Sequence, residues 1–350
     1  MNAKKIDPAK LGFGIHFTDH MYVIKYHEDK GWYDGGIVDY RPFQMSPASS
    51  VLHYSQEIFE GLKAYKTPDQ RVLAFRPEMN ARRMNRSARE ICMPELPEDI
   101  FLEAVRSLVM KDREWIPDAP GTSLYIRPTM LGVEAFLGVR PAKEYMFYII
   151  LSPVGPYYSC GFTPVGIYVE DTLVRAAKGG TGDIKTGGNY AASLLGQMKA
   201  QEKGFPQVLW LDAKEHRYVE EVGSMNVFFV YGKTLVTPPL TGSILPGITR
   251  DSVLTLAEDM GYGVEERALE INGLLEDVLS GRVTESFGTG TAAVISPMGS
   301  LFYKEKNYVI NNNQVGEVTQ KLYDRLVGIQ IGREPDPYGW VCELGKMDGQ

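Results

Sequence analysis

Hydrophobic residues in the first half of the chain are spaced as in strands mixed with helices. A helix is expected to begin near Arg76 and Pro77, because proline suits the first turn of a helix. A second helix is expected in residues 97–116, where apolar residues recur at three- and four-residue spacing. Strand patterns occur at residues 21–26, 58–65, 72–75, 122–131 and 144–155. We therefore predict that residues 1–155 form a small N-terminal α+β domain.

A segment rich in Gly, Pro and aromatic residues follows at 156–168 and predicts an interdomain linker. Beyond it, strand and helix patterns alternate with Gly-rich loops as far as residue 350, so residues 169–350 are expected to form a larger C-terminal domain. Its expected elements are strands at 166–176 and 206–212, a hairpin in 221–239, and helices in 189–204, 244–261 and 315–328. The fold class predicted from the pattern alone is α+β with two domains.

The composition is that of a globular protein that acts on small molecules. The 350 residues are 44% hydrophobic and 23% charged, which suffices for two domains of ordinary size. A formal net charge of -7 without long runs of Lys or Arg argues against nucleic-acid binding. No stretch approaches the length of a membrane span. The cysteines, Cys92, Cys160 and Cys342, are far apart, so neither a disulfide framework nor a zinc site is indicated, and we expect a cytoplasmic protein.

Metal and nucleotide sites find little support. His16 and His20 are four residues apart, but their segment has a strand pattern, so the two rings are not expected to share a face. The chain has no G-x-G-x-x-G motif after a strand, no G-x-S-x-G motif and no P-loop.

Lys185 is the most unusual charged residue, because glycines flank it on both sides in the segment GGTGDIKTGG. Such a backbone can approach a ligand closely. Three interpretations are open: a solvated lysine in a turn, a lysine that binds phosphate, and a lysine that forms a Schiff base with a carbonyl cofactor.

A Schiff base with pyridoxal phosphate would require donors for the phosphate and a carboxylate for the ring nitrogen. Backbone N–H groups of Ile248 and Thr249, at the start of a helix, could bind the phosphate, although Thr249 could also be a plain N-cap. Arg83 could add a guanidinium, although its helix could simply present a solvated basic face. Glu221 enters an apolar strand and could pair with the ring nitrogen; the alternative is a strand-end glutamate in water, as we expect for Glu220.

Five segments occur in a characteristic order. They are YIRP, VRAAKGGTGDIKTGGNY, EVGSMN, LPGITR and FGTGTAA. In these segments, and over nearly its whole length, the chain resembles the branched-chain-amino-acid aminotransferases, which are pyridoxal-phosphate enzymes of fold type IV. The resemblance implies a small α+β domain, a larger domain with a β-barrel core, and a homodimer.

The resemblance also implies roles for individual residues around the cofactor. Lys185 would be the catalytic residue that forms the Schiff base, Glu221 would pair with the ring nitrogen, and Tyr190 would bind the ring hydroxyl. The phosphate would be held by Arg83, the backbone of Ile248 and Thr249, and Thr289 or Thr291. Arg175 matches a position near the cofactor.

For the substrate, the resemblance implies that Thr291 and Ala292 receive the α-carboxylate, with help from Tyr125. Arg127 would receive a second carboxylate. The remaining predicted pocket residues are aromatic or apolar, and two of them, Leu137 and Val139, would come from a partner subunit. The others are Phe13, Tyr54, Phe59 and Tyr157.

The implied activity is transfer of the amino group of L-leucine, L-isoleucine or L-valine to 2-oxoglutarate in a ping-pong reaction. Alternatives are a D-amino-acid aminotransferase or an aminodeoxychorismate lyase of the same fold and, more remotely, a ligand-binding protein without catalysis. Ala293 and Ser296 stand where vertebrate relatives carry a C-x-x-C pair, so no thiol switch is expected. An Arg- and Ser-rich leader is absent, which agrees with the cytoplasmic expectation.

Overall fold

The computed structural model describes residues 6–155 and 161–348, and the chain divides into two compact units. The first unit comprises Met1–Tyr157, Lys185–Gly187 and Gly328–Gln350, and the second comprises Tyr158–Ile184 and Gly188–Val327. This division differs from the expected one, in which residues 169–350 form a single domain. The C-terminal segment joins the first unit because one of its strands pairs with a strand that lies far away in the sequence.

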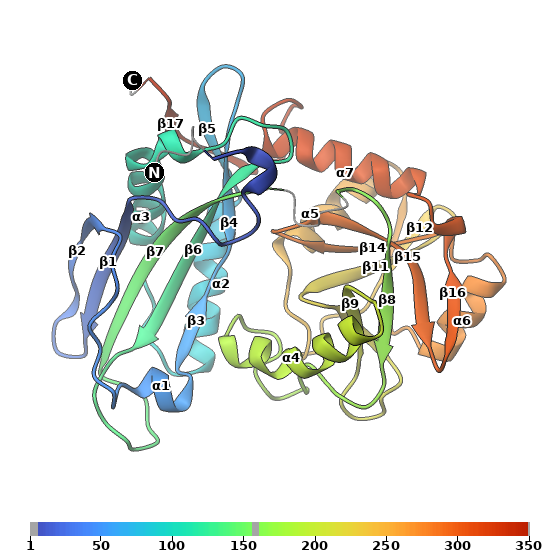
Figure 1. Ribbon diagram of the computed structural model, residues 1–350, viewed down its shortest axis with the longest axis horizontal. Coiled ribbons are helices and arrows are strands. Elements are labelled where there is room, and N and C mark those ends of the chain that lie inside the picture. The colour runs from blue at the N-terminus through green and yellow to red at the C-terminus, as the bar shows by residue number, and fades with distance from the viewer. Residues whose placement is uncertain (1–5, 156–160, 349–350) are drawn as a thin grey trace. The chain divides into compact units, whose positions relative to one another are not determined.

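In the first unit the described strands form one sheet in the order β17-β5-β4-β6-β7-β1-β2, with β3 also paired to β6 (Figure 1). All of these pairings are antiparallel. The strands are β1 (His20–His27), β2 (Gly31–Asp39), β3 (Glu57–Phe59), β4 (Leu62–Lys66), β5 (Arg71–Phe75), β6 (Ser123–Gly132), β7 (Glu144–Val154) and β17 (Val341–Lys346). The predicted strands are confirmed, except that the single strand expected at residues 58–65 is divided into β3 and β4, and β2 and β17 are additions. The sequence of β2 does not alternate clearly, because most of its residues are only half-buried.

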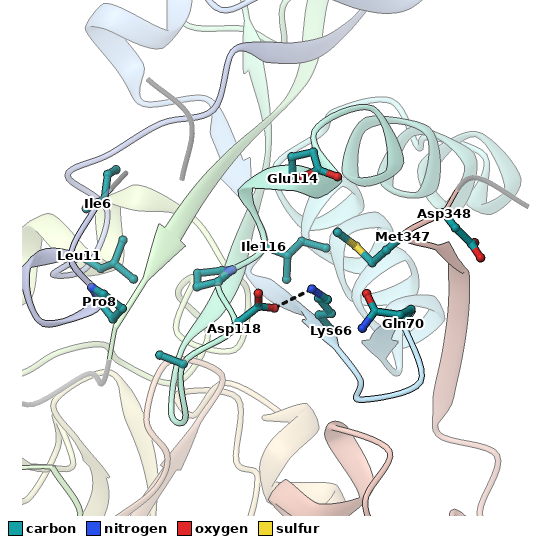
Figure 2. Close-up of a pocket in the computed structure, with 12 residues that line it drawn as sticks. Ile6, Pro8, Leu11, Lys66, Gln70, Glu114, Ile116, Asp118, Met347 and Asp348 are labelled. Atoms are coloured by element: carbon teal, nitrogen blue, oxygen red, sulfur yellow. Dashed lines mark ion pairs between the residues drawn. The ribbon is translucent and has the colours of Figure 1, made fainter. Parts of the chain in front are cut away.

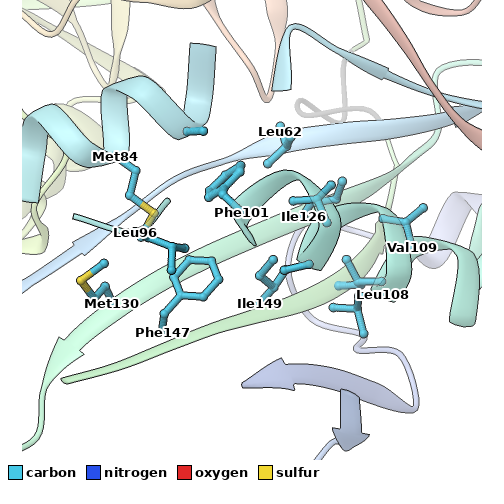
Figure 3. Close-up of a cluster of buried hydrophobic side chains, with 14 of the residues drawn as sticks. Leu62, Met84, Leu96, Phe101, Leu108, Val109, Ile126, Met130, Phe147 and Ile149 are labelled. Atoms are coloured by element: carbon cyan, nitrogen blue, oxygen red, sulfur yellow. The ribbon is translucent and has the colours of Figure 1, made fainter. Parts of the chain in front are cut away.

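Helices α2 (Pro77–Glu90) and α3 (Glu98–Lys111) confirm the two predicted helices, and a short α1 (Ser50–Tyr54) precedes β3. Side chains of α2 and α3 pack with one face of the sheet in a single buried cluster. Figure 3 shows Met84 and Phe101 from these helices close to Ile126 and Phe147 from β6 and β7. Each such side chain contributes about 1.5–3 kcal/mol through burial. The opposite face of the sheet therefore remains available for polar and aromatic residues.

In the second unit the described strands β10, β9, β8, β15, β14 and β11 follow one another, and a pairing between β10 and β11 closes them into a barrel. The predicted β-barrel core is thus confirmed. The strands are β8 (Val165–Glu170), β9 (Gln207–Leu211), β10 (Val219–Val222), β11 (Met225–Tyr231), β12 (Thr234–Thr237), β13 (Gly263–Glu266), β14 (Glu285–Gly290), β15 (Val294–Tyr303) and β16 (Lys306–Val309). The remaining helices are α4 (Gly187–Glu202), α5 (Ile248–Asp259), α6 (Ile271–Leu279) and α7 (Glu317–Gln330).

Two local expectations for this region need correction. The strand expected at residues 166–176 ends at Glu170, whose carboxylate accepts hydrogen bonds from the backbone of Thr172 and Leu173 and turns the chain. The linker expected at residues 156–168 overlaps β8, which begins at Val165, while residues 156–160 lie outside the described part of the chain. Among the described residues, no helix is both long and apolar enough to cross a membrane.

Candidate active site

The backbone around Lys185 is bound to β3 and α2. The N–H of Phe59 donates to the carbonyl of Lys185 over 3.0 Å, and the N–H of Lys185 donates to Oγ of Ser87 over 3.1 Å. The Thr186 hydroxyl donates to the carbonyl of Glu57 over 2.8 Å. The half-buried Lys185 side chain places its Nζ 4.9 Å from the centroid of the Phe59 ring. These contacts do not fit an ordinary solvated turn lysine.

Predicted substrate residues gather on the face of the sheet that points away from the apolar core. Phe59 pairs with Thr129, and Tyr125 and Arg127 lie on the same face of β6 as Thr129 because side chains alternate along a strand. The guanidinium carbon of Arg127 lies 4.8 Å from the Phe59 ring centroid, and its Nη2 donates to the Tyr125 hydroxyl over 3.0 Å. The ring of Phe13 lies 4.9 Å from that of Tyr125. The structure thus brings four predicted pocket residues together beside Lys185.

Gly61 allows the hydroxyl of Tyr125 to reach this position. A Cβ atom at Gly61 would lie 2.1 Å from that hydroxyl oxygen, well inside van der Waals contact. Any larger residue would push the Tyr125 ring away from Arg127. The glycine of the EGLKAY segment therefore has a packing role.

Lys63 pairs directly with Tyr125 and is buried on the same face. Burial lowers its pKa to about 8, from 10.5. The charged amine therefore destabilises the fold below pH 8, and this cost disappears as the pH rises from about 8 to 10.5. We expect Lys63→Met to raise the free energy of unfolding at pH 7 by about 3 kcal/mol, since one pKa unit corresponds to ~1.4 kcal/mol.

Urea unfolding of the wild type and of Lys63→Met between pH 7 and 10.5 checks this prediction. The increase in the free energy of unfolding caused by Lys63→Met should become smaller as the pH rises. The control Lys25→Met, at an exposed position of β1, should show no such dependence on pH. A gain that does not depend on pH would contradict the assignment to the buried charge.

The remaining predicted pocket residues are not part of the group around Phe59 and Arg127. The Tyr54 hydroxyl donates to the carbonyl of Leu137 over 2.5 Å, and both residues are exposed. Leu137 is 64% exposed and Val139 is 88% exposed, in the loop between β6 and β7. Tyr157 lies outside the described residues.

Arg83 forms a buried ion pair that the sequence did not predict. Its Nε lies 2.7 Å from Oε1 of Glu60 and its Nη2 lies 2.8 Å from Oε2, while Asn80 donates to Oε2 over 2.8 Å. Burial alone would raise the pKa of Glu60, but Arg83 outweighs it, with help from Lys185, and the pKa is lowered. In the sequence, Glu60 directly follows the apolar residues Ile58 and Phe59 of β3. A charged residue after an apolar pair was the one sign in the sequence that Glu60 could be buried and need a cationic partner. The solvated-face interpretation is correct for Arg82, which is 60% exposed, but wrong for Arg83.

Removing the Glu60 carboxylate should leave the guanidinium of Arg83 buried without its partner. We expect Glu60→Ala to lower the free energy of unfolding by about 3–5 kcal/mol. A matched control is Glu95→Ala, which breaks an exposed ion pair with Arg89 of the same helix and should cost no more than about 1 kcal/mol. Urea unfolding of both variants at pH 7 measures the difference, and equal losses would refute the role given to burial.

In the second unit, Glu221 of β10 is 3% exposed and is held by two side chains. Its Oε2 lies 2.6 Å from Nε of Arg175, and Asn226 donates to Oε1 over 3.2 Å. Arg175 also donates to the carbonyls of Gly182 and Ser243. From the sequence, the ring nitrogen of the cofactor was the expected cationic partner of Glu221. In the structure, Arg175 already supplies a cation to this carboxylate. Glu221 is therefore a rigid buried anion, not a strand-end glutamate in water.

Glu220 was expected to be that solvated glutamate, and this expectation is wrong. Its side chain is 6% exposed and accepts a hydrogen bond from the Ser243 hydroxyl. Burial raises the pKa of Glu220, although the Ser243 hydroxyl and Arg175 oppose the increase. The expectation placed Glu221 on a buried face of the strand and its neighbour Glu220 on a solvated face. It failed because both faces of β10 are buried.

The N-terminus of α5 begins with a glycine, which has no side chain that could cap the helix. Gly247 is the N-cap residue, so the alternative that Thr249 is the N-cap is wrong. Thr249 is buried in the first turn. A Cβ atom at Gly247 would lie 2.0 Å from Oδ1 of Asn226, so glycine is required for this close approach. The first-turn N–H groups, which include those of Ile248 and Thr249, receive no cap from a side chain of the N-cap residue.

A buried hydroxyl lies close to this helix end. Thr289 of β14 pairs with Asn226 of β11, so both side chains lie on one face, and Asn226 contacts Gly247. Within the described residues, the buried Oγ1 of Thr289 has no hydrogen-bond partner. A buried hydroxyl without a partner is costly, and an anion bound at the helix N-terminus would supply an acceptor. These residues therefore fit the phosphate group of a cofactor.

Three more predicted residues are only partly buried. Tyr190 lies in the first turn of α4, and Thr291 and Ala292 lie in the turn between β14 and β15.

A cavity of about 680 Å³ in the first unit lies elsewhere. Figure 2 shows that an ion pair between Lys66 and Asp118, 2.9 Å apart, crosses it beside Ile116 and Met347. None of the predicted site residues lines this cavity, so its size does not identify the active site.

Comparisons with known proteins agree with the fold and with the family that the sequence resembles. The model of the amino-transferase class IV family matches residues 57–301. Branched-chain-amino-acid aminotransferase 2 of Bacillus subtilis (strain 168) is 52% identical over 343 residues, which cover 98% of this chain and 94% of the relative. The crystal structure of Escherichia coli branched-chain amino acid aminotransferase superposes with a TM-score of 0.80 at 28% identity, covering 94% of this chain and 100% of that one.

A third match is the crystal structure of the T.th. branched-chain amino acid aminotransferase complexed with N-(5'-phosphopyridoxyl)-L-glutamate. Its TM-score is 0.75 at 26% identity, over 93% of this chain and 98% of that one. The fold is therefore that of a class IV aminotransferase. Within that class, the chain belongs to the branched-chain-amino-acid aminotransferase family.

Proposed function

We propose that the chain transfers the amino group of L-leucine, L-isoleucine or L-valine to 2-oxoglutarate in a ping-pong reaction that uses pyridoxal phosphate. The observation that carries this proposal is the environment of one aromatic ring. Nζ of Lys185 lies 4.9 Å from the centroid of the Phe59 ring, and the guanidinium carbon of Arg127 lies 4.8 Å from the same point. An amine for proton transfer and a cation for a side-chain carboxylate thus share an apolar surface.

Pyridoxal phosphate, when bound, supplies an electron sink for the α-carbon of the amino acid. Lys185 would hold its carbonyl carbon, Glu221 its ring nitrogen and Tyr190 its ring hydroxyl. The phosphate would be held by Arg83, by the N–H groups of Ile248 and Thr249, and by the hydroxyl of Thr289 or Thr291. Two features of the described residues support this assignment: the glycine N-cap of α5 and the buried Thr289 hydroxyl, which has no hydrogen-bond partner among them. The phosphopyridoxyl compound in the related structure supports it as well.

Lys185 and Glu221 would divide the catalytic work. The Nζ amine of Lys185 would take the α-proton of the amino acid and would carry it to another carbon of the bound group, not back to the α-carbon. Glu221 would present a fixed negative charge to the ring nitrogen. Arg175 would contribute by fixing the position of that carboxylate, and the ion pair between the two side chains supports this role.

Substrate choice follows from the pocket on the sheet face. Thr291 and Ala292 would bind the α-carboxylate through backbone N–H groups, with Tyr125 assisting. Phe13, Phe59 and Tyr125 would cover an aliphatic side chain, whose burial contributes about 1.5–3 kcal/mol, so discrimination among leucine, isoleucine and valine should be modest. Arg127 would pair with the γ-carboxylate of glutamate or 2-oxoglutarate, which an apolar pocket would leave unpaired.

We also propose a homodimer in the cytoplasm. Exposed apolar residues in one loop support the dimer, since Leu137 and Val139 are 64% and 88% exposed and a second copy would bury them. These two residues would then complete the pocket of the partner subunit. The wide spacing of the cysteines in the sequence supports the location.

The visible absorption spectrum of the purified protein with pyridoxal phosphate tests the proposal, before and after addition of L-leucine or D-alanine without an acceptor. Conversion of the cofactor band to that of the pyridoxamine form by L-leucine alone is the expected result. Conversion by D-alanine alone would instead identify a D-amino-acid aminotransferase. A protein that binds no pyridoxal phosphate would overturn the assignment of Lys185.

A further inference from the structure

Glu57 is a charged residue on the pocket face to which neither the sequence nor the proposed reaction assigns a function. It begins β3 and pairs with Leu131, as Phe59 pairs with Thr129. Alternation along the strands therefore places Glu57, Phe59 and Arg127 on one face. Ile58, between them, points into the apolar core on the other face.

The carboxylate of Glu57 is fixed in place. It accepts a hydrogen bond from the N–H of Gly187, the first residue of α4, where the helix dipole favours a negative charge. The carbonyl of Glu57 accepts the Thr186 hydroxyl over 2.8 Å, so the residue is bound through both side chain and backbone. Burial raises the pKa of Glu57, and the Gly187 N–H and the charge of Arg127 oppose the increase.

The charge of Arg127 acts on the Glu57 carboxyl and opposes the rise in its pKa that burial causes. Its guanidinium stacks over the rings of Phe59 and Tyr125, and its buried Nε has no hydrogen-bond partner in the described part of the chain. The described ion pairs include none within 4.0 Å between Arg127 and Glu57. The guanidinium thus remains open to a substrate while a fixed anion lies farther along the same face.

A pocket that accepts both an aliphatic side chain and a γ-carboxylate must balance two requirements. A guanidinium without a nearby anion would bind dicarboxylates strongly and would disfavour an aliphatic group that displaces its water. A carboxylate in contact with the guanidinium would neutralise it and exclude the dicarboxylate. A fixed carboxylate at a longer distance weakens the attraction without blocking it.

We propose that Glu57 is a positioning and specificity-determining residue that acts through Arg127, reducing its attraction for γ-carboxylates so that one pocket serves both substrate types. This inference rests on the proposed function, specifically on the assignment of Arg127 to the γ-carboxylate. Glu57 also anchors the N-terminus of α4, and a test must separate the two contributions.

Glu57→Gln and Glu57→Ala separate charge from hydrogen bonding, because the glutamine carbonyl can still accept the Gly187 N–H and alanine cannot. The measurement is calorimetric binding of glutarate and of 4-methylvalerate to the pyridoxal-phosphate form, together with KM and kcat for L-glutamate and L-leucine. Thermal unfolding of each variant reports on the anchoring role.

We expect Glu57→Gln to bind glutarate about three- to tenfold more tightly relative to 4-methylvalerate than the wild type does, with little change in thermal stability. KM for L-glutamate should fall relative to KM for L-leucine, with kcat less affected. Glu57→Ala should show the same change in preference together with a lower melting temperature. An unchanged glutarate preference in Glu57→Gln would overturn the inference and leave Glu57 with only its anchoring role.

The double variant Glu57→Gln with Arg127→Ala distinguishes failure of the inference from failure of the proposed function. If the inference holds, Glu57→Gln changes the preference only when Arg127 is present. An equal change without Arg127 would show that Glu57 does not act through it. If Arg127→Ala alone leaves the preference for glutarate unchanged, the substrate assignment in the proposed function is what fails.

Discussion

Lys185→Ala is expected to abolish transamination of L-leucine. Loss of proton transfer alone should reduce the rate by about 10²- to 10⁴-fold, and the variant also loses the amine that holds the cofactor carbonyl. The fold should survive, because the hydrogen bonds that fix this segment come from the backbone of Lys185 and not from its side chain. Steady-state turnover and the visible spectrum of the same preparation measure both effects.

Lys178→Ala is the matched control, since Lys178 is an exposed lysine in the same glycine-rich region of the chain. It should retain wild-type turnover. Near-normal transamination by Lys185→Ala would remove the basis of the proposed reaction, whatever the behaviour of the control.

The second large effect concerns Arg127. Arg127→Ala should reduce kcat/KM for L-glutamate about 10²-fold more than kcat/KM for L-leucine, because truncating one partner of a buried charge pair costs about 2–5 kcal/mol and 1.4 kcal/mol is a factor of ten. Leucine makes no charge contact there, so its loss should reflect only the packing of Arg127 on Phe59 and Tyr125. Kinetics of both half-reactions with the purified variant measure the ratio.

Arg106→Ala provides a control for the loss of a positive charge, since Arg106 pairs with Glu103 on the exposed face of α3. Neither substrate should be affected by it. Equal losses for glutamate and leucine in Arg127→Ala would refute the role assigned to Arg127 while leaving the role of Lys185 untouched.

Two errors made from the sequence have the same physical origin. Glu220 was expected to lie in solvent, and a plain N-cap was kept open as an alternative for Thr249, whereas both residues are buried and the N-cap is Gly247. In each case a local rule was applied to a residue whose environment depends on distant segments: Ser243 for Glu220, and the approach of Asn226 to Gly247 for the start of α5. The order of residues within one segment does not show which distant segments will pack against it.

The sequence by itself located many of the helices and strands and indicated the family. Apolar spacing located α2, α3 and the long strands, since periodicity depends only on which face of an element is buried. The glycines around Lys185 and the order of the five segments identified the family, because those residues are the ones the chemistry requires.

Only the tertiary structure decided how these parts support one another. It closed the barrel through the pairing of β10 with β11, joined β17 to β5, and gave the buried carboxylates of Glu60 and Glu221 their arginine partners. Burial of a charge is favourable only if a partner arrives from another part of the chain. That partner is selected by the packing of whole elements, and the spacing of residues along one segment does not specify it.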